Sequence, residues 1–286
     1  MKMIKPIVNL SKVAGDYDTF IFGFNGVLSD GEHILPEAAS CLRNLAAMRK
    51  KLVIVTNSYL RVAEIIALLL KENIPLDIFS NIVSAGEILH YKLKAAQNEY
   101  AAVGNSYYQL GAKNGRGVFY GLPFNEVSGI EQAHFLYMSE VRSSEDLLDT
   151  YRPVLEHAVG LGLPFVCAGN DTSCFIGGKL SLAPGALAEA YAILGGRIIT
   201  VGKPDIKIFR YALEGIGETG RIVVICDNVA TDIKAATLLD YDSILISKGR
   251  HVNYLGEGYI PDVAKTRELS ISYDVSPNCV ISAMRW

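Results

Sequence analysis

The amino-acid sequence predicts an α/β protein with a doubly wound parallel sheet and a second, smaller α/β unit inserted into it. Strand-like apolar runs alternate with helical patterns along almost the whole chain. The clearest of these runs are apolar on both faces, as strands covered by helices on both sides must be. The 286 residues have room for one large domain or two ordinary ones.

The elements of the larger unit come from the two ends of the chain. Pro36 suits the first turn of a helix, and residues 61–72 indicate a second helix. A third helix is expected at about 204–214, and a fourth follows the segment CDNVATD, which ends at Asp232. The expected strands of this unit are 19–24, 51–57, 221–228 and 243–248.

The middle of the chain, about 86–196, repeats the alternation on its own. This repetition indicates an inserted unit with a small sheet of its own. The glycine-rich stretch IGGKLSLAPG, residues 176–185, is expected to be a loop. The expected strands of this unit are 100–105, 133–139 and 164–170, and its expected helices are 144–160 and 184–194.

The composition favours a compact, reduced protein. Half of the residues are hydrophobic and the net charge is −3, so nothing indicates a nucleic-acid or membrane-surface partner. The N-terminal stretch lacks the long apolar core of a signal peptide. The five cysteines are scattered without metal-type spacing, which favours buried free thiols over a redox role. We therefore expect a cytoplasmic protein.

Polar side chains gather where expected strands end, at the edge of a parallel sheet where loops form a crevice. Each of them alone also fits a turn, a solvated surface charge or a helix N-terminus. Together, a hydroxyl, a lysine and a pair of carboxylates suit a phosphate bound beside a divalent cation. The residues are Thr56, Asn57 and Ser58 after the second strand, Lys203 in VGKP, and Asp227 and Asp232 after the third strand.

The segments VIVTNS, VGKP and CDNVATDI resemble, in this order, the second, third and fourth motifs of the haloacid dehalogenase (HAD) superfamily of aspartate-nucleophile phosphatases. The resemblance covers nearly the whole chain and is to subfamily IIA, the p-nitrophenylphosphatase-like branch with a large α/β cap. It implies a doubly wound HAD-like core domain of residues 1–85 and 197–286. It also implies an inserted α/β cap domain of residues 86–196.

The resemblance also implies a role for each matched residue. Asp227 and Asp232 correspond to acidic metal-site residues, so magnesium is the implied cofactor. A small phosphorylated metabolite or phosphate is the implied partner, and a homodimer is a further implied partner because caps of this type often dimerise. The stretch CAGND resembles the substrate loop of the cap. The implied substrate-binding residues are Thr56, Asn57, Ser58, Lys203 and Asp171.

The first motif departs from the family pattern, Asp-x-Asp-Gly-Val-Leu, because the chain reads GFNGVL there. Gly23 takes the position of the nucleophile, and glycine has no side chain that could attack phosphorus. Asn25 takes the position of the general acid/base and cannot cycle a proton, although its backbone carbonyl could still bind a metal. Since the first aspartate is also a metal ligand, magnesium is expected to bind more weakly, mainly through Asp227.

Three interpretations of these changes remain open at this point. The first is a Mg-dependent phosphatase by descent that is inactive or strongly impaired, since losing a general acid alone costs ~10²–10⁴-fold in rate. The second is an active small-molecule phosphatase with an unconventional nucleophile, such as Asp30 or a water molecule. The third is an active parent in which positions 23 and 25 were changed deliberately.

Overall fold

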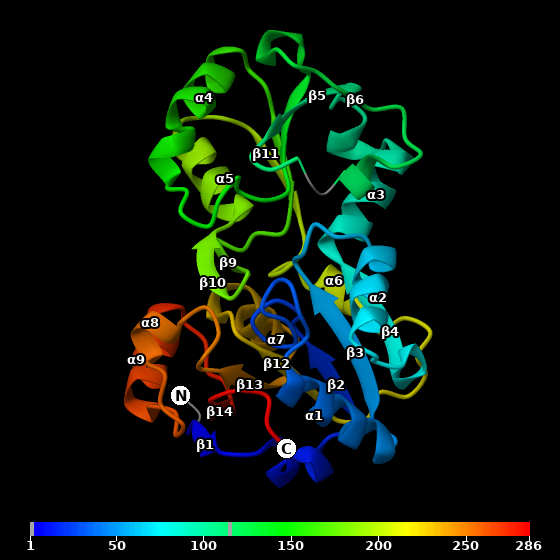
Figure 1. Ribbon diagram of the computed structural model, residues 1–286, viewed down its shortest axis with the longest axis vertical. Coiled ribbons are helices and arrows are strands. Elements are labelled where there is room, and N and C mark those ends of the chain that lie inside the picture. Colours follow the sequence, from blue (N-terminus) through cyan, green and yellow to red (C-terminus); the bar gives the residue numbers. More distant parts are fainter. Residues whose placement is uncertain (1–2, 114–115) are drawn as a thin grey trace.

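The computed structural model describes residues 3–113 and 116–286 and shows two parallel sheets, one above the other (Figure 1). The lower sheet has seven strands in the order β1-β14-β13-β12-β2-β3-β4, all paired in parallel. The described part of the chain begins and ends beside this sheet, far from the upper one (Figure 1). The strands are β1 (Lys5–Ile7), β2 (Thr19–Phe22), β3 (Lys51–Thr56), β4 (Phe79–Ser84), β12 (Ile222–Cys226), β13 (Asp242–Ile246) and β14 (Cys279–Ile281).

Helices cover both faces of the seven-stranded sheet. Since side chains alternate between the faces of a strand, Phe20 and Phe22 of β2 pack with α1 and α2, whereas Ile21 packs with α6 and α7. This two-sided burial accounts for strands that are apolar on both faces. The helices of this part are α1 (Pro36–Ala47), α2 (Val62–Lys71), α6 (Lys207–Leu213), α7 (Lys234–Leu238), α8 (Val252–Leu255) and α9 (Val263–Ser272).

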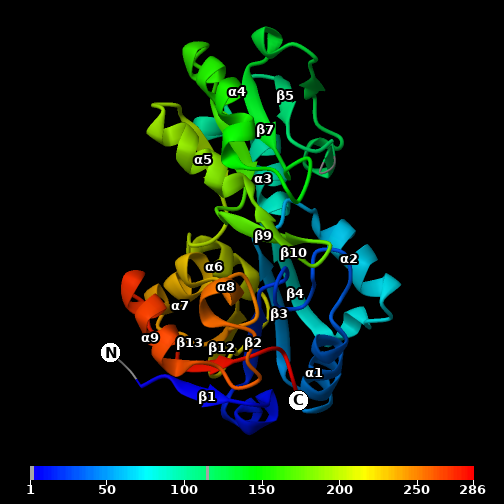
Figure 2. The same ribbon diagram turned by 60° about the vertical axis from the view of Figure 1, so that its left-hand side comes forward.

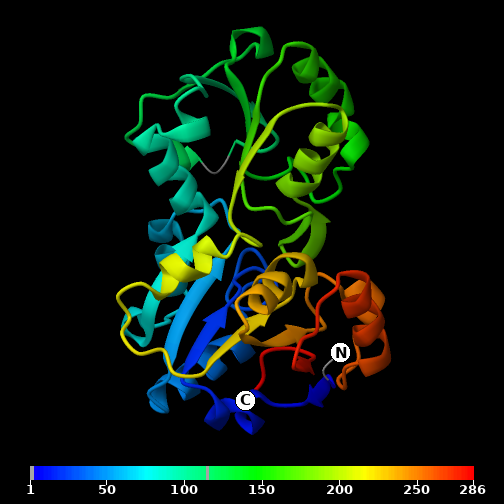
Figure 3. The same cartoon turned by 180° about the vertical axis from the view of Figure 1, so that it is seen from behind.

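The upper sheet has five parallel strands in the order β11-β8-β7-β5-β6. Helix α3 (Ala85–Ala95) packs on one face, and α4 (Leu148–Gly160) and α5 (Pro184–Ile193) pack on the other. Seen from behind, the chain passes between the two sheets at α3 and again after β11 (Figure 3). The strands are β5 (Ser106–Leu110), β6 (Asn125–Glu126), β7 (Phe135–Met138), β8 (Phe165–Ala168) and β11 (Ile198–Val201).

A two-stranded antiparallel hairpin lies between the two sheets (Figure 2). It consists of β9 (Ser173–Ile176) and β10 (Lys179–Leu182). Gly177 and Gly178 form its turn with φ of 55° and 74°, a conformation that glycine adopts without steric cost. The prediction of a loop at 176–185 was therefore wrong, because the paired glycines close a hairpin.

The structure confirms the predicted α/β fold class with a doubly wound parallel core. The predicted strand at 100–105 was wrong: residues Asn98–Tyr100 form a short 3-10 helix, Gly104 turns the chain with φ of 81°, and β5 begins only at Ser106. Strand β11 pairs in the five-stranded sheet although it begins after residue 196, where the cap was expected to end. The division into domains at residues 86 and 196 stays a prediction.

Candidate active site

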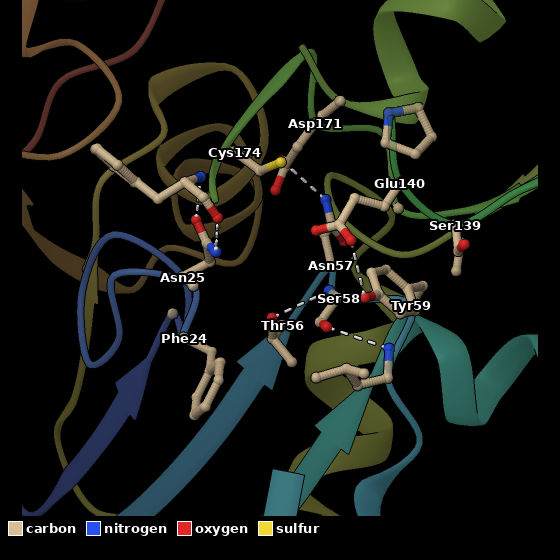
Figure 4. Close-up of a pocket in the computed structure, with 18 of the residues that line it drawn as sticks. Phe24, Asn25, Thr56, Asn57, Ser58, Tyr59, Ser139, Glu140, Asp171 and Cys174 are labelled. Atoms are coloured by element: carbon tan, nitrogen blue, oxygen red, sulfur yellow. Dashed lines mark hydrogen bonds between the residues drawn. The ribbon is translucent and has the colours of Figure 1, made fainter. Parts of the chain in front are cut away.

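The predicted site residues meet at the carboxyl edge of the seven-stranded sheet. Every one of them except Asp232 lines a single cavity of about 90 Å³ between the core sheet and the β9–β10 hairpin (Figure 4). A cavity of this size has room for several water molecules or one phosphate-sized group. The loops at the carboxyl ends of the core strands thus bring the predicted residues to one cavity.

Lys203 follows β11 and is 3% exposed. Its Nζ donates to Asp232 Oδ1 at 2.6 Å and to the carbonyl of Val55 at 3.1 Å. Burial alone would lower the pKa of Lys203, but the carboxylates of Asp232 and Asp171 outweigh it and raise that pKa, so the ammonium stays charged. Because an ammonium has three donors and Lys203 lines the cavity, one donor remains for a ligand.

Asn57 organises the loop that carries Lys203. Its Oδ1 accepts from the backbone N of Lys203 at 2.7 Å, and its Nδ2 donates to the carbonyl of Lys203 at 3.1 Å. The hydroxyl of Thr56, the residue before it, accepts from the backbone N of Ser58 at 3.1 Å (Figure 4). Accepting this bond leaves the Thr56 hydroxyl proton available as a donor to a phosphate oxygen in the cavity.

Gly23 follows directly after β2, and its backbone N donates to the carbonyl of Ile225 at 2.9 Å. A Cβ built at this position would lie 3.8 Å from Asp232 Oδ1 and 3.1 Å from Val27 Cγ2. A side chain here would thus start beside the Lys203–Asp232 pair. Position 23 lines the cavity but contributes only backbone to it.

The side chain of Asn25 binds the backbone of the hairpin. It offers no titratable group to a substrate. Its Nδ2 donates to the carbonyl of Phe175 at 2.9 Å, and its Oδ1 accepts from the backbone N of Phe175 at 2.7 Å (Figure 4). This pair of bonds needs one donor and one acceptor on the same side chain, which an amide has and a carboxylate lacks. Asn25 therefore fastens β9 to the core.

Arg250 is the site residue that sequence reasoning missed. It follows β13 and lies buried, with its backbone N donating to Asp227 Oδ2 at 3.0 Å and its Nε donating to Asp227 Oδ1 at 3.3 Å. Its guanidinium also donates to the carbonyl of Ser173 and lies 3.4 Å from Asp171 Oδ2. The signal that could have found it is the same edge rule, because Arg250 stands just beyond the end of a core strand.

Asp171 reaches from the upper part of the molecule into this cluster. Its Oδ1 accepts from Asn57 Nδ2 at 3.0 Å, Asn228 Nδ2 at 2.8 Å and Thr231 Oγ1 at 2.9 Å. Burial by itself would raise the pKa of Asp171, but Arg250, Lys203 and these hydrogen bonds lower it, so the carboxylate is ionised. All of these donors belong to the core. The contact of Asp171 with a substrate stays a prediction.

The carboxylates do not fit a divalent cation. Both oxygens of Asp227 accept hydrogen bonds from Arg250, and Asp232 is paired with Lys203. Within residues 3–113 and 116–286, no group of three His, Cys, Asp or Glu side chains is placed to hold a metal ion. Mg²⁺ needs several oxygen ligands in near-octahedral geometry. Here the carboxylates of Asp227 and Asp232 already bind cationic side chains.

The Asp30 carboxylate is hydrogen-bonded outside the cavity, and the two thiols nearest the site are protonated. Asp30 does not line the cavity, and its Oδ1 accepts from the backbone N of Glu32 and His33 at 3.0 and 2.8 Å. Burial raises the pKa of the Cys226 thiol, and it raises that of Cys174, which lines the cavity, to about 12. Both thiols are therefore protonated at neutral pH and poorly nucleophilic.

Fold and site together define a capped α/β protein of the hydrolase type, with its site at the edge of a parallel core sheet. The chain belongs to the haloacid dehalogenase-like hydrolase superfamily. A family model described as haloacid dehalogenase-like hydrolase matches residues 20–115, and one described as HAD-hydrolase-like matches residues 200–262. Together they cover more than half of the chain.

Solved structures share this fold. A haloacid dehalogenase-like hydrolase from Brucella suis 1330 is 25% identical, with a TM-score of 0.77 over 96% of this chain and 98% of its own. A "possible sugar phosphatase" from Cytophaga hutchinsonii is 21% identical, with a TM-score of 0.73 over 99% of this chain and 98% of its own. Glycerol phosphate phosphatase from Mycobacterium tuberculosis, solved in complex with magnesium, is 19% identical, with a TM-score of 0.57 over 83% of this chain and 70% of its own.

None of the curated proteins matches this chain. In the part of the chain that the structure describes, no helix combines the length and the apolar character that crossing a bilayer requires.

Proposed function

We propose that this chain descends from Mg-dependent phosphatases of small phosphorylated metabolites and now binds phosphate or such a metabolite without efficient hydrolysis. The observation that carries the proposal is the cavity, which keeps Thr56 and Lys203 as donors but has only glycine at position 23 facing them. Two of the similar structures are described as sugar or glycerol phosphate phosphatases, which supports a small phosphorylated ligand.

Hydrolysis through an acyl phosphate needs a carboxylate that attacks phosphorus and a second group that moves a proton. Gly23 cannot form the covalent bond, and the amide of Asn25 is committed to the backbone of Phe175. Binding needs neither step. It needs donors around an anion, and the Thr56 hydroxyl and the Lys203 ammonium supply them.

Binding is tested by the thermal shift that inorganic phosphate produces, measured in the wild type and in Lys203→Met. We expect a rise in melting temperature for the wild type that Lys203→Met abolishes and that Lys12→Met, a change at an exposed lysine, leaves intact. Because Lys203→Met leaves Asp232 buried without its cation, Lys203→Met/Asp232→Asn serves as the second variant. A wild type whose melting temperature does not respond to phosphate would reject the proposal.

Turnover is tested with p-nitrophenyl phosphate in the presence of Mg²⁺. We expect no hydrolysis above the background rate. Robust hydrolysis that Lys203→Met abolishes would replace this proposal by the alternative, an active phosphatase with an unconventional nucleophile. In that case the hydrolysis rate of Asp30→Asn would show whether the Asp30 carboxylate is that nucleophile.

A further inference from the structure

We propose that the guanidinium of Arg250 takes the place of a divalent cation in this site, so that phosphate binds here without a metal. The inference rests on the proposed function, in which the cavity binds phosphate. It adds the identity of the positive charge that stands beside the anion.

The contacts of Arg250 are those of a fixed cation. Its Nε and backbone N bind the two oxygens of Asp227 at 3.3 and 3.0 Å, and its side chain is 5% exposed. The same guanidinium reaches Asp171 at 3.4 Å and the carbonyl of Ser173. Oxygen atoms from the core and from the hairpin side thus surround one positive group, and Arg250 itself lines the cavity.

The backbone around Asp227 is built to hold this arrangement. A Cβ at Gly249 would lie 2.2 Å from Asp227 Cβ, so only glycine lets the turn before Arg250 come this close. A Cβ at Gly26 would lie 2.0 Å from Asp227 Oδ2. Two glycines and Arg250 thus pack against the Asp227 carboxylate, and in our proposal a metal ion at this carboxylate would compete with the guanidinium.

The charges of the site agree with this replacement. In the family pattern, two first-motif aspartates together with a divalent cation carry no net charge. Here Gly23, Asn25 and Arg250 together carry one positive charge. Lys203, Asp227 and Asp232 match the family motifs and enter both sums equally, so by this count the site without a metal is no less positive than the family pattern with its metal. One guanidinium can therefore balance the charge of the site once both first-motif carboxylates are absent.

The first measurement uses the wild-type protein and needs no variant. Mn²⁺ alone is titrated with the protein and the free ion is followed by electron paramagnetic resonance. We expect the signal of free Mn²⁺ to persist, and the phosphate-induced thermal shift to be the same in EDTA as in Mg²⁺. Binding of Mn²⁺ by the wild type that Asp227→Asn removes, or a phosphate shift that EDTA abolishes, would overturn the proposal.

The second measurement uses Arg250→Met, which removes the guanidinium from the Asp227 carboxylate. Arg250→Met keeps the length of the side chain and removes its charge, and we expect it to bind Mn²⁺ at least tenfold more tightly than the wild type. Asp227→Asn added to Arg250→Met should abolish that gain. Arg221→Met, which breaks the exposed pair with Asp242, is the matched control and should bind no more Mn²⁺ than the wild type.

An Arg250→Met variant that folds and gains no Mn²⁺ binding would contradict the inference, and if it fails to fold, the wild-type titration decides. The Mn²⁺ arms contain no phosphate. A protein that binds neither phosphate nor Mn²⁺ therefore refutes the proposed function and, with it, metal-free binding of phosphate. Mn²⁺ binding by the wild type that Asp227→Asn removes refutes the role of Arg250 alone.

Discussion

The double hydrogen bond between Asn25 and Phe175 allows a sharp prediction for Asn25→Asp. The carboxylate could still accept from the backbone N of Phe175, but its second oxygen would face the Phe175 carbonyl across the present 2.9 Å contact. One hydrogen bond is lost, and the carbonyl is left facing another acceptor, which costs about 1–3 kcal/mol. If this cost falls on the closed position of the hairpin, its open population rises roughly 5- to 150-fold.

Cys174, the neighbour of Phe175 on β9, reports this opening. The other four cysteines are buried, whereas Cys174 is partly exposed at the cavity, where burial raises its pKa to about 12. Alkylation of Cys174 by iodoacetamide, followed by peptide mass spectrometry, should accelerate in Asn25→Asp and not in Asn253→Asp, a matched change at an exposed asparagine. Equal alkylation rates in wild type and Asn25→Asp would refute the idea that the amide fastens the hairpin.

Three further outcomes are expected. Gly26→Ala should lower the free energy of unfolding in urea by at least about 2 kcal/mol, because its φ is 80° and the new Cβ would lie 2.0 Å from Asp227 Oδ2. Burial lowers the pKa of His251 from 6.5 to about 4. Between these two pH values the unfolded chain binds a proton at His251 and the folded chain does not. The unfolding free energy should therefore fall by up to about 3 kcal/mol as pH drops through that window, and His251→Gln should flatten the profile. Gly23→Asp alone should leave p-nitrophenyl phosphate hydrolysis at background, as should Gly23→Ala, because Arg250 still occupies the Asp227 carboxylate.

The fold class followed from local patterns because buried strands and amphipathic helices are encoded within short windows. Runs such as TFIF and IVVIC are apolar on both faces, and the structure places them at the centre of the seven-stranded sheet. The hairpin at Ser173–Leu182 escaped prediction because its strands have only four residues each and its pairing depends on two glycines in the turn. The same holds for residues 100–105, where β propensity yielded to a 3-10 turn and Gly104.

Part of the site could be predicted from the sequence, because its residues follow core strands at their carboxyl ends and occur in the order of the family motifs. Thr56, Lys203 and Asp227 come together as expected around one cavity. What sequence could not supply were the partners of each charge, since Arg250 lies 23 positions from Asp227 along the chain and 79 from Asp171. Such pairings depend on how loops from different strands meet, and the sequence contains no local periodicity that reports them.

In our proposal, Gly23, Asn25 and Arg250 act as one linked set of residues. A Cβ at position 23 would lie 3.8 Å from Asp232 Oδ1, so a carboxylate there would add negative charge beside the Lys203–Asp232 pair. Arg250 is already bound to Asp227 and Asp171, and in our proposal its guanidinium occupies the place of the metal. Asn25 in turn holds the hairpin down over the guanidinium through Phe175. We therefore expect that carboxylates at positions 23 and 25, with Arg250 still present, add negative charge and loosen the hairpin without rebuilding a metal-dependent phosphatase.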